Sequence, residues 1–240
     1  MIHKYITLQV FYSTDIQGSH IRLEGEEAKH CFKVLRHKAG DQLYITDGAG
    51  NLYRCKIEDG HWEHHVISIQ EKLTPVSSRP YQLHIAIALT KNPDRLEWFI
   101  EKAVETGVDK ITLLKTHRTE KGSVKMDRLL NKAISAMKQS LHFTLPDIQP
   151  VTEWKDFISL PHDEKKYVAY CGDQEKIHLS ELTLTNKILI AIGPEGDFTE
   201  DEILKAQQQG FELLSLGDSR FRTETAALAA CMGLYFKFTK

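Results

Sequence analysis

Apolar and polar residues alternate in short runs over the first 70 residues of the chain. A period of two is typical of strands, because successive side chains point to opposite faces. Three such runs occupy residues 42–46, 52–57 and 66–69. Residues 47–51, Asp-Gly-Ala-Gly-Asn, lie between the first two runs and have the composition of a hairpin turn. The pattern predicts a small β-rich domain, which we expect to form a barrel.

One segment of this first region has helical spacing instead. Within residues 26–35, one face of a helix would carry Ala28, Cys31, Phe32 and Leu35. Residues 73–80, Leu-Thr-Pro-Val-Ser-Ser-Arg-Pro, contain two prolines and two serines, which indicates a linker. We therefore expect a β-rich domain at 1–72, a linker at 73–80 and a second domain at 81–240.

Beyond the linker, strand-like runs alternate with helical patterns. The expected strands lie at 81–89, 110–114, 167–170, 187–192 and 211–216. The expected helices follow Asp94, span 127–141, begin at the capping box of Thr199 and Glu202, and span 224–236. This alternation predicts an α/β domain with a mostly parallel sheet. In such sheets, ligands bind in the loops at the carboxyl ends of the strands.

Three details of these helices can be predicted from their side chains. Asp94 is placed to cap the first helix and Gly107 to end it. The inward side of helix 127–141 is expected to carry Leu130, Ile134, Met137 and Leu141. Helix 224–236 is apolar almost all round, which predicts burial on every side.

The composition is that of a globular protein, with 41% hydrophobic and 27% charged residues. No run of about 18 apolar residues is present, so no transmembrane helix is expected. The N-terminal residues lack the apolar core and cleavage site of a signal peptide. The four cysteines, which form no CxxC pair, are Cys31, Cys55, Cys171 and Cys231. These features predict a reduced, cytoplasmic protein without a structural zinc site or a membrane partner.

The net charge of −2 does not mark the whole chain as a nucleic-acid-binding protein, so local charge has to carry that argument. One stretch is basic, with Lys115, Arg118, Lys121, Lys125, Arg128, Lys132 and Lys138 against the acids Glu120 and Asp127. Such a stretch is either a solvated helix face or a surface that binds phosphates.

Two loops stand out in the second region. The first, residues 193–197 (Gly-Pro-Glu-Gly-Asp), lies between the strand 187–192 and the capped helix. Its glycines allow the backbone to approach a ligand closely, and its proline restricts the turn. The same composition also suits a tight strand-to-helix turn without a ligand.

The second loop, residues 216–226 (Leu-Gly-Asp-Ser-Arg-Phe-Arg-Thr-Glu-Thr-Ala), leads from a strand into the last helix. Thr223 and Glu224 have a structural explanation: Thr223 can cap the helix, and the charge of Glu224 complements the positive end of the helix dipole. Arg220 and Arg222 do not, because a cation near a helix N-terminus is unfavourable unless it meets an anion. An RNA phosphate or a ligand carboxylate would supply that anion.

These two loops resemble the C-terminal signature of the RsmE-type RNA methyltransferases of the SPOUT class. Residues 91–108, which start Lys-Asn-Pro-Asp-Arg-Leu-Glu-Trp, resemble the first helix of that catalytic domain. Residues 30–41, His-x-x-x-Val-Leu-Arg-x-x-x-Gly-Asp, resemble its PUA-like N-terminal domain. The similarity covers nearly the whole chain in the family's order. Departures are Asp197 in place of a common glycine, Phe221 in place of an aliphatic residue and His142 in place of an arginine.

The resemblance implies a SPOUT fold with a parallel sheet and a deep trefoil knot, preceded by a small PUA-like β-barrel. It implies a homodimer that methylates N3 of a uridine in 16S ribosomal RNA of the small subunit. It further implies S-adenosylmethionine as the methyl donor. The residues expected to bind this cofactor are Cys171, Gly172, Ile192, Gly193, Pro194, Glu195, Gly196, Leu216, Gly217, Phe221, Arg222, Thr223, Thr225 and Ala226.

Methyl transfer to N3 of uridine requires loss of the N3 proton, and therefore a base or a cation that stabilises the uridine anion. We expect Arg222 to stabilise the uridine or its phosphate, and Glu224 to orient Arg222 or to take part in the proton path. The basic residues expected to bind RNA phosphates are Arg22, Lys33, Arg36, Arg118, Lys121 and Lys125. No metal site is expected, because the histidine-rich segment 61–65 has no second ligand cluster at a suitable spacing.

Two other functions stay open at this point. One is a SPOUT methyltransferase that acts on a different RNA base. The other is an RNA-binding ribosome-assembly factor without catalysis, which would bind RNA but no cofactor.

Overall fold

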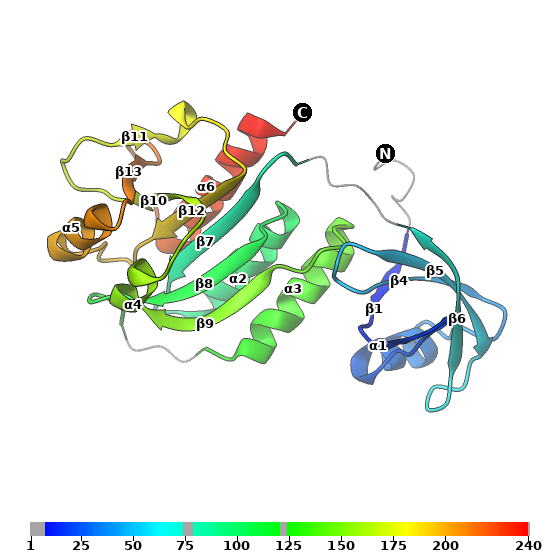
Figure 1. The fold of residues 1–240 in the computed structure, drawn as a ribbon. Helices are drawn as coiled ribbons and strands as arrows, with labels where there is room; N and C mark the ends of the chain where they lie inside the picture. Colours follow the sequence, from blue (N-terminus) through cyan, green and yellow to red (C-terminus); the bar gives the residue numbers. More distant parts are fainter. Residues whose placement is uncertain (1–7, 74–78, 121–123, 240) are drawn as a thin grey trace. The chain divides into compact units, whose positions relative to one another are not determined.

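The computed structural model of the chain describes residues 8–73, 79–120 and 124–239 (Figure 1). These residues form two compact units. The first unit contains the described residues up to 73 together with Ile134–Leu145, and the second contains the remainder. The segment 134–145 was not expected in the first unit, because the sequence pattern places it inside a helix of the second region.

A six-stranded curled sheet forms the frame of the first unit, in the order β1-β4-β5-β6-β3-β2. Its strands are β1 (Val10–Tyr12), β2 (Ile16–Gln17), β3 (His20–Ile21), β4 (Gln42–Thr46), β5 (Leu52–Asp59) and β6 (Val66–Leu73). β1 pairs with β4 in parallel, and the other pairs are antiparallel. The three strands predicted for this region are all present, and the second and third are longer than expected.

The helix predicted for this unit is present but changes its winding halfway. An α-helix, α1 (Gly25–Lys29), continues directly as a π-helix, η2 (His30–Val34). Ala28, Cys31 and Phe32 are buried in the core, as predicted. Leu35 is exposed, which corrects the prediction. A π-turn holds more residues than the α-turn assumed from the spacing, so Leu35 is rotated away from the core.

The segment 134–145 completes the first unit through side-chain and backbone contacts. Phe143 packs in a small apolar cluster with Val10 and Leu52. The carbonyl of Phe143 accepts a hydrogen bond from the N–H of Gly50 at 2.8 Å, and the N–H of Leu145 donates to the carbonyl of Gly48 at 2.7 Å. The predicted hairpin turn at 47–51 is therefore stabilised by residues far along the chain.

The second unit is built on a seven-stranded sheet in which every pairing is parallel. The strand order is β11-β13-β10-β12-β7-β8-β9. The strands are β7 (Gln82–Ala88), β8 (Lys110–Lys115), β9 (Asp147–Glu153), β10 (Lys165–Ala169), β11 (Ile177–His178), β12 (Lys187–Ile192) and β13 (Glu212–Ser215). The parallel α/β sheet is confirmed, whereas β9 and β11 were not predicted.

Helices flank this sheet (Figure 1). They are α2 (Pro93–Glu105), α3 (Met126–Ser140), α4 (Trp154–Ser159), α5 (Glu200–Gln208) and α6 (Thr223–Phe238), with a short 3-10 turn η3 (Leu179–Glu181). The capping box of α5 is confirmed, because Thr199 accepts from the N–H of Glu202 and Glu202 accepts from the N–H of Thr199. The predicted cap of α2 was wrong. Asn92 is the cap and accepts from the N–H of Asp94 at 3.0 Å, since Pro93 takes the first helical position.

Two predictions of buried helix faces need correction. In α3 the buried residues are Leu129, Ala133, Ala136 and Met137, and Leu130 is exposed. The apolar positions of this helix fit two registers that differ by one residue, and the register with the small alanines is buried. In α6 a single face is buried, formed by Ala227, Ala230, Cys231 and Leu234. Phe236 is 70% exposed, so α6 is not covered all round within one chain.

Candidate active site

The strand order of the second unit brings three loops to one edge of the sheet. β10 lies between β12 and β13, and all three run in parallel. Ala169 near the end of β10 is level with Ile192 of β12 and with Leu214 of β13. The segments that follow these strands therefore leave the sheet at its carboxyl edge. They contain the three groups of residues predicted to bind the cofactor.

The loop after β12 is fixed by Asp197. This residue has a φ of 61°, a left-handed conformation that favours glycine and that aspartate tolerates better than most residues. Its Oδ1 accepts from the N–H of Phe198 at 2.8 Å, and its Oδ2 accepts from the N–H of Cys171 at 2.9 Å. The departure from the family's glycine thus keeps the backbone conformation and adds a hydrogen bond between two of the three loops.

Close packing explains the two glycines of this loop. A Cβ on Gly193 would lie 3.0 Å from the ring of Phe198, and a Cβ on Gly196 would lie 3.2 Å from the side chain of Arg118. The Arg118 Nη1 donates to the carbonyl of Gly196 at 2.6 Å. Arg118, predicted as a phosphate-binding residue, therefore also holds the loop in place.

Arg95 on α2 connects the loop after β12 with the N-terminus of α6. Its Nη1 lies 3.7 Å from Oε1 of Glu195, and its Nε lies 3.7 Å from Oε1 of Glu224. The N–H of Lys91 also donates to Glu195, at 3.4 Å. Sequence reasoning did not select Arg95 as a site residue, although it belongs to the Lys91–Trp98 motif. Among the described residues, Glu224 pairs with Arg95. No ion pair between Glu224 and Arg222 is present there, so the expected orientation of Arg222 by Glu224 is not supported by a direct contact.

The N-terminus of α6 lacks a side-chain cap. Arg222 takes the capping position without a capping hydrogen bond, and Thr223 is the first helical residue. The interpretation of Thr223 as the cap was therefore wrong, because the helix begins one residue earlier than expected. The Oγ1 of Thr223 and the Oε2 of Glu224 are buried and have no hydrogen-bond partner within the described parts of the chain. Buried polar atoms are rarely left unpaired, so these two atoms are candidates for contact with a bound ligand or a water molecule.

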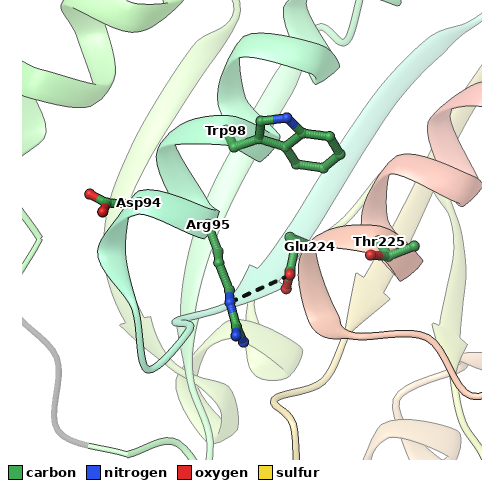
Figure 2. A pocket seen from close by; sticks show the side chains of 5 residues that line it. All are labelled: Asp94, Arg95, Trp98, Glu224 and Thr225. Atoms are coloured by element: carbon green, nitrogen blue, oxygen red, sulfur yellow. Dashed lines mark ion pairs between the residues drawn. The ribbon is translucent and has the colours of Figure 1, made fainter.

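A pocket of about 270 Å³ lies beside this helix N-terminus (Figure 2). Its lining residues are Asp94, Arg95, Trp98, Glu224 and Thr225. The side chains of Arg95 and Glu224 approach each other from α2 and α6, and the indole of Trp98 lies next to them. Trp98 is 43% exposed, so a large aromatic surface is open at the pocket.

The loop after β13 presents unpaired cations. Arg220 and Arg222 are exposed, and neither guanidinium forms an ion pair within the residues that the structure describes. Both guanidinium groups are therefore available to an external anion, and the binding of such an anion stays a prediction. In the neighbouring loop, burial first and Asp197 second raise the pKa of the Cys171 thiol. A raised pKa disfavours the thiolate, so Cys171 is not an activated nucleophile.

The remaining predicted RNA-binding residues fall in separate places. Arg22, Lys33 and Arg36 are exposed on the first unit, and Lys125 is exposed just before α3. Lys121 lies outside the described residues. No group of side chains able to hold a metal ion occurs in ranges 8–73, 79–120 and 124–239. Over the same residues, no helix has the length and apolar character needed to span a membrane.

Comparison with known proteins gives two matching families. The chain matches the RNA methyltransferase domain over residues 77–234 and the RNA methyltransferase PUA domain over residues 23–61. It is 30% identical over 224 residues to ribosomal RNA small subunit methyltransferase E of Rickettsia conorii, covering 89% of this chain and 88% of that protein. It is 28% identical to the protein of the same name in Bacillus subtilis, covering 90% and 89%.

Solved structures show the same fold over the whole length. A probable rRNA-methyltransferase of Porphyromonas gingivalis superposes with a TM-score of 0.90 at 37% identity, covering 96% of this chain and 98% of that chain. A Legionella pneumophila protein in complex with the bound cofactor SAM superposes with a TM-score of 0.84 at 27% identity, covering 95% and 96%. With a catalytic-domain match over most of its length, the chain belongs to the PUA-containing RNA methyltransferase family that includes ribosomal RNA small subunit methyltransferase E.

Proposed function

We propose that the protein transfers a methyl group from S-adenosylmethionine to N3 of a specific uridine in 16S ribosomal RNA of the small subunit. The observation that carries this proposal is the meeting of three loops at the carboxyl edge of β10, β12 and β13, with two unpaired polar atoms at the N-terminus of α6. The names of the relatives and the SAM complex of the Legionella protein support the same reaction.

The three loops fit a cofactor held largely by backbone groups. Gly193 and Gly196 allow Phe198 and Arg118 to pack closely against the loop after β12, and Asp197 fixes this loop against Cys171. Gly217, with a φ of 115°, gives the loop after β13 a conformation that other residues rarely adopt. When bound, S-adenosylmethionine supplies an activated methyl group on its sulfonium, so the protein's contribution is alignment and electrostatics.

The residues proposed for catalysis lie in the loop after β13 and at the start of α6. Arg222 is exposed and has no ion-pair partner among the described residues, so its guanidinium is available to stabilise the uridine anion that forms when N3 loses its proton. Glu224 is buried and paired with Arg95, and its second oxygen has no hydrogen-bond partner in the same part of the chain. We assign Glu224 to the proton path and Arg95 to holding its carboxylate in place.

The first unit is proposed to bind the RNA, because it matches the PUA domain and exposes Arg22, Lys33 and Arg36. Phosphate contacts of this kind should make the affinity fall as the salt concentration rises. A substrate in the small ribosomal subunit places the protein in the cytoplasm. The trefoil knot implied by the family resemblance stays a prediction.

A homodimer is proposed on the apolar surface that one chain leaves uncovered. Phe236 of α6 and Trp98 of α2 are exposed, and α2 and α6 pack against each other. Large exposed apolar side chains on adjacent helices favour contact with a second copy. We expect Trp98→Glu to convert a dimer into a monomer, measured by light scattering after gel filtration, whereas Leu204→Glu on the exposed side of α5 should leave the mass unchanged. A wild type that elutes as a monomer at micromolar concentration would contradict this proposal.

The first test is a calorimetric titration with S-adenosylmethionine. We expect the wild type to bind and Gly196→Trp to lose binding, because the indole would occupy the loop and displace Arg118. The matched control is Leu204→Trp, which adds the same side chain at an exposed position of the following helix. If the wild type does not bind the cofactor with or without RNA, the result would favour the alternative of a non-catalytic RNA-binding ribosome-assembly factor over the methyltransferase.

The second test identifies the product. Small-subunit RNA from a deletion strain, before and after complementation, is analysed for N3-methyluridine by mass spectrometry of nucleosides. Appearance of N3-methyluridine with the wild type and not with Gly196→Trp supports the proposed reaction. Appearance of a different methylated base would favour the alternative of a related methyltransferase with another target.

A further inference from the structure

The exposed hydrophobic side chains of the first unit gather in two segments. Within its described residues, the large exposed hydrophobics are Val34, Leu35, Trp62 and Val66. Val34 and Leu35 end the π-helix η2, whereas Trp62 and Val66 belong to the turn that leads into β6. Val34 is 60% exposed and Trp62 is 39% exposed. Apolar side chains gathered at the surface mark an interaction site more often than scattered ones do.

Direct contacts join these two segments into one surface. The Nζ of Lys33 lies 3.4 Å from the centroid of the Trp62 ring. The rings of Phe32 and His65 are 4.8 Å apart, and the N–H of Leu23 donates to Nε2 of His65 at 3.0 Å. The turn with Trp62 is therefore held by His65 against the buried residues Phe32 of η2 and Leu23, which follows β3.

The backbone on both sides of this surface is unusual and well defined. The turn is closed by a hydrogen bond from the N–H of His64 to the carbonyl of His61 at 3.2 Å, and the two histidine rings stack 5.5 Å apart. On the other side, η2 is followed by Arg36, whose φ of 60° is uncommon for a residue other than glycine. Single π-turns and left-handed residues occur frequently at functional sites.

Cations lie beside the exposed indole of Trp62. Arg22, Lys33, Arg36 and Lys38 are exposed on the surrounding segments, where the exposed acids are Glu24, Glu26, Asp41, Glu58, Asp59 and Glu63. An exposed aromatic ring with an ammonium group over one face matches a nucleotide, whose base stacks on a ring and whose phosphate meets a cation. Residues 23–61, which include Lys33 and Arg36, match the RNA methyltransferase PUA domain, and this match favours an RNA over a protein partner.

We propose that this surface, the Trp62 surface (Arg22, Lys33, Arg36 and Trp62), captures an unstacked base of single-stranded RNA on the indole of Trp62. This proposal rests on the RNA-directed function proposed above and specifies how the first unit recognises its substrate. Lys33 contacts the phosphate next to the captured base, and Arg22 and Arg36 contact the flanking backbone.

The test measures binding of a short unstructured single-stranded RNA and of its duplex to the full-length protein. Trp62→Ala is expected to weaken single-strand binding roughly 5- to 150-fold, the range that loss of one base–aromatic stack gives. Trp62→Phe is expected to retain most of the affinity, because the phenyl ring still offers a stacking face. Quenching of tryptophan fluorescence by the single strand should be smaller in Trp62→Phe than in the wild type, the remaining signal coming from Trp98 and Trp154.

Two lysines on the same helical segment provide a matched comparison. Lys33→Met should weaken single-strand binding and lower the salt dependence by about one phosphate contact. Lys29→Met, one turn earlier and paired with Glu26 at 3.4 Å, should change neither quantity. Trp62 lies in an exposed turn, so thermal unfolding of its variants should match that of the wild type.

The outcomes separate this proposal from the proposed function. If the wild type and Trp62→Ala bind the single strand equally well and both bind S-adenosylmethionine, the proposal of base capture by the Trp62 surface is wrong. The proposed methyltransferase function is not affected by that result. Equal loss of duplex and single-strand binding would also overturn base capture. Weaker binding to intact small subunits with unchanged binding to RNA would assign the surface to a ribosomal protein instead. A wild type that binds neither RNA nor cofactor would overturn both proposals.

Discussion

The two loops that form the candidate active site differ in how their polar groups are satisfied. In the loop after β12, Asp197 bonds to two backbone N–H groups, Glu195 pairs with Arg95, and Gly196 accepts from Arg118. Among residues 8–73, 79–120 and 124–239, the two exposed arginines of the loop after β13 have no ion-pair partner, and two buried oxygen atoms of the helix that follows it have no hydrogen-bond partner. The polar groups of the first loop that are named here have partners within the protein, whereas those of the second loop are available to a ligand. We infer that the first loop gives the site its shape and the second contacts what reacts.

The largest expected effect belongs to the second loop. Arg222→Ala should lower kcat by about 100- to 1000-fold, as loss of one group that stabilises transition-state charge does in other enzymes. The affinity for S-adenosylmethionine should fall less than kcat, since the loop after β12 and the backbone of the loop after β13 are unchanged. Single-turnover methylation with saturating cofactor and RNA measures the effect, with Arg220→Ala as the neighbouring control. Near-normal turnover of Arg222→Ala would remove this residue from the mechanism.

The next effect concerns the ion pair that joins the two loops. Arg95→Ala leaves the buried carboxylate of Glu224 without its partner, which should lower the free energy of unfolding by about 1 to 3 kcal/mol. Glu224→Gln should lower it less, because a neutral amide tolerates burial better. In the double variant the losses should not add, and the coupling energy from this cycle measures the interaction. Additive losses would show that Arg95 and Glu224 act independently.

A smaller effect is expected at Asp197. Asp197→Gly keeps the left-handed conformation and loses the bond to Cys171, whereas Asp197→Ala loses the bond and adds backbone strain. Alanine should therefore be less stable than glycine by about 1 kcal/mol. Thermal unfolding of the two variants checks this order. Equal stability would mean that the backbone relaxes at this position.

The smallest effect concerns the reactivity of Cys171. Burial and the carboxylate of Asp197 raise the pKa of its thiol, so alkylation at pH 8 should be slow. Asp197→Asn removes the second cause and should lower the pKa, which increases the thiolate fraction and the alkylation rate by about two- to threefold. Mass spectrometry of the labelled peptide measures the rate. Cys231, which is buried with a pKa raised to about 12, serves as an unreactive internal reference. An unchanged rate at Cys171 would contradict the electrostatic contribution of Asp197.

Local features of the fold were predictable from the sequence. The capping box of Thr199 and Glu202 depends on residues three apart, and the strand at 187–192 depends on an unbroken apolar run, so both could be placed without tertiary information. The cap of α2 was missed by two residues, because Asn92 and Asp94 are both good capping residues and Pro93 decides between them. The winding of η2 could not be predicted, because π-turns have no clear spacing signal.

Features that depend on distant contacts were not predictable. Arg95 reaches Glu195 and Glu224, which lie 100 and 129 positions further along the chain, and nothing in its own motif points to these partners. The departure at Asp197 could be noticed from the sequence, but its explanation needed the backbone angle. The three loops were correctly expected at the carboxyl edge, since strands alternate with helices throughout this region. Their contact with the cofactor stays a prediction.

The inclusion of residues 134–145 in the first unit has a consequence for synthesis of the protein. Translation proceeds from the N-terminus, and domains generally fold as units as they emerge from the ribosome. The apolar cluster around Val10 and Leu52 receives Phe143 only after more than a third of the second unit has been made. The apolar cluster of the nascent first unit therefore lacks Phe143 while residues 74–133 are being synthesised. Its final folding step and the early folding of the catalytic sheet are tied to the same stage of translation.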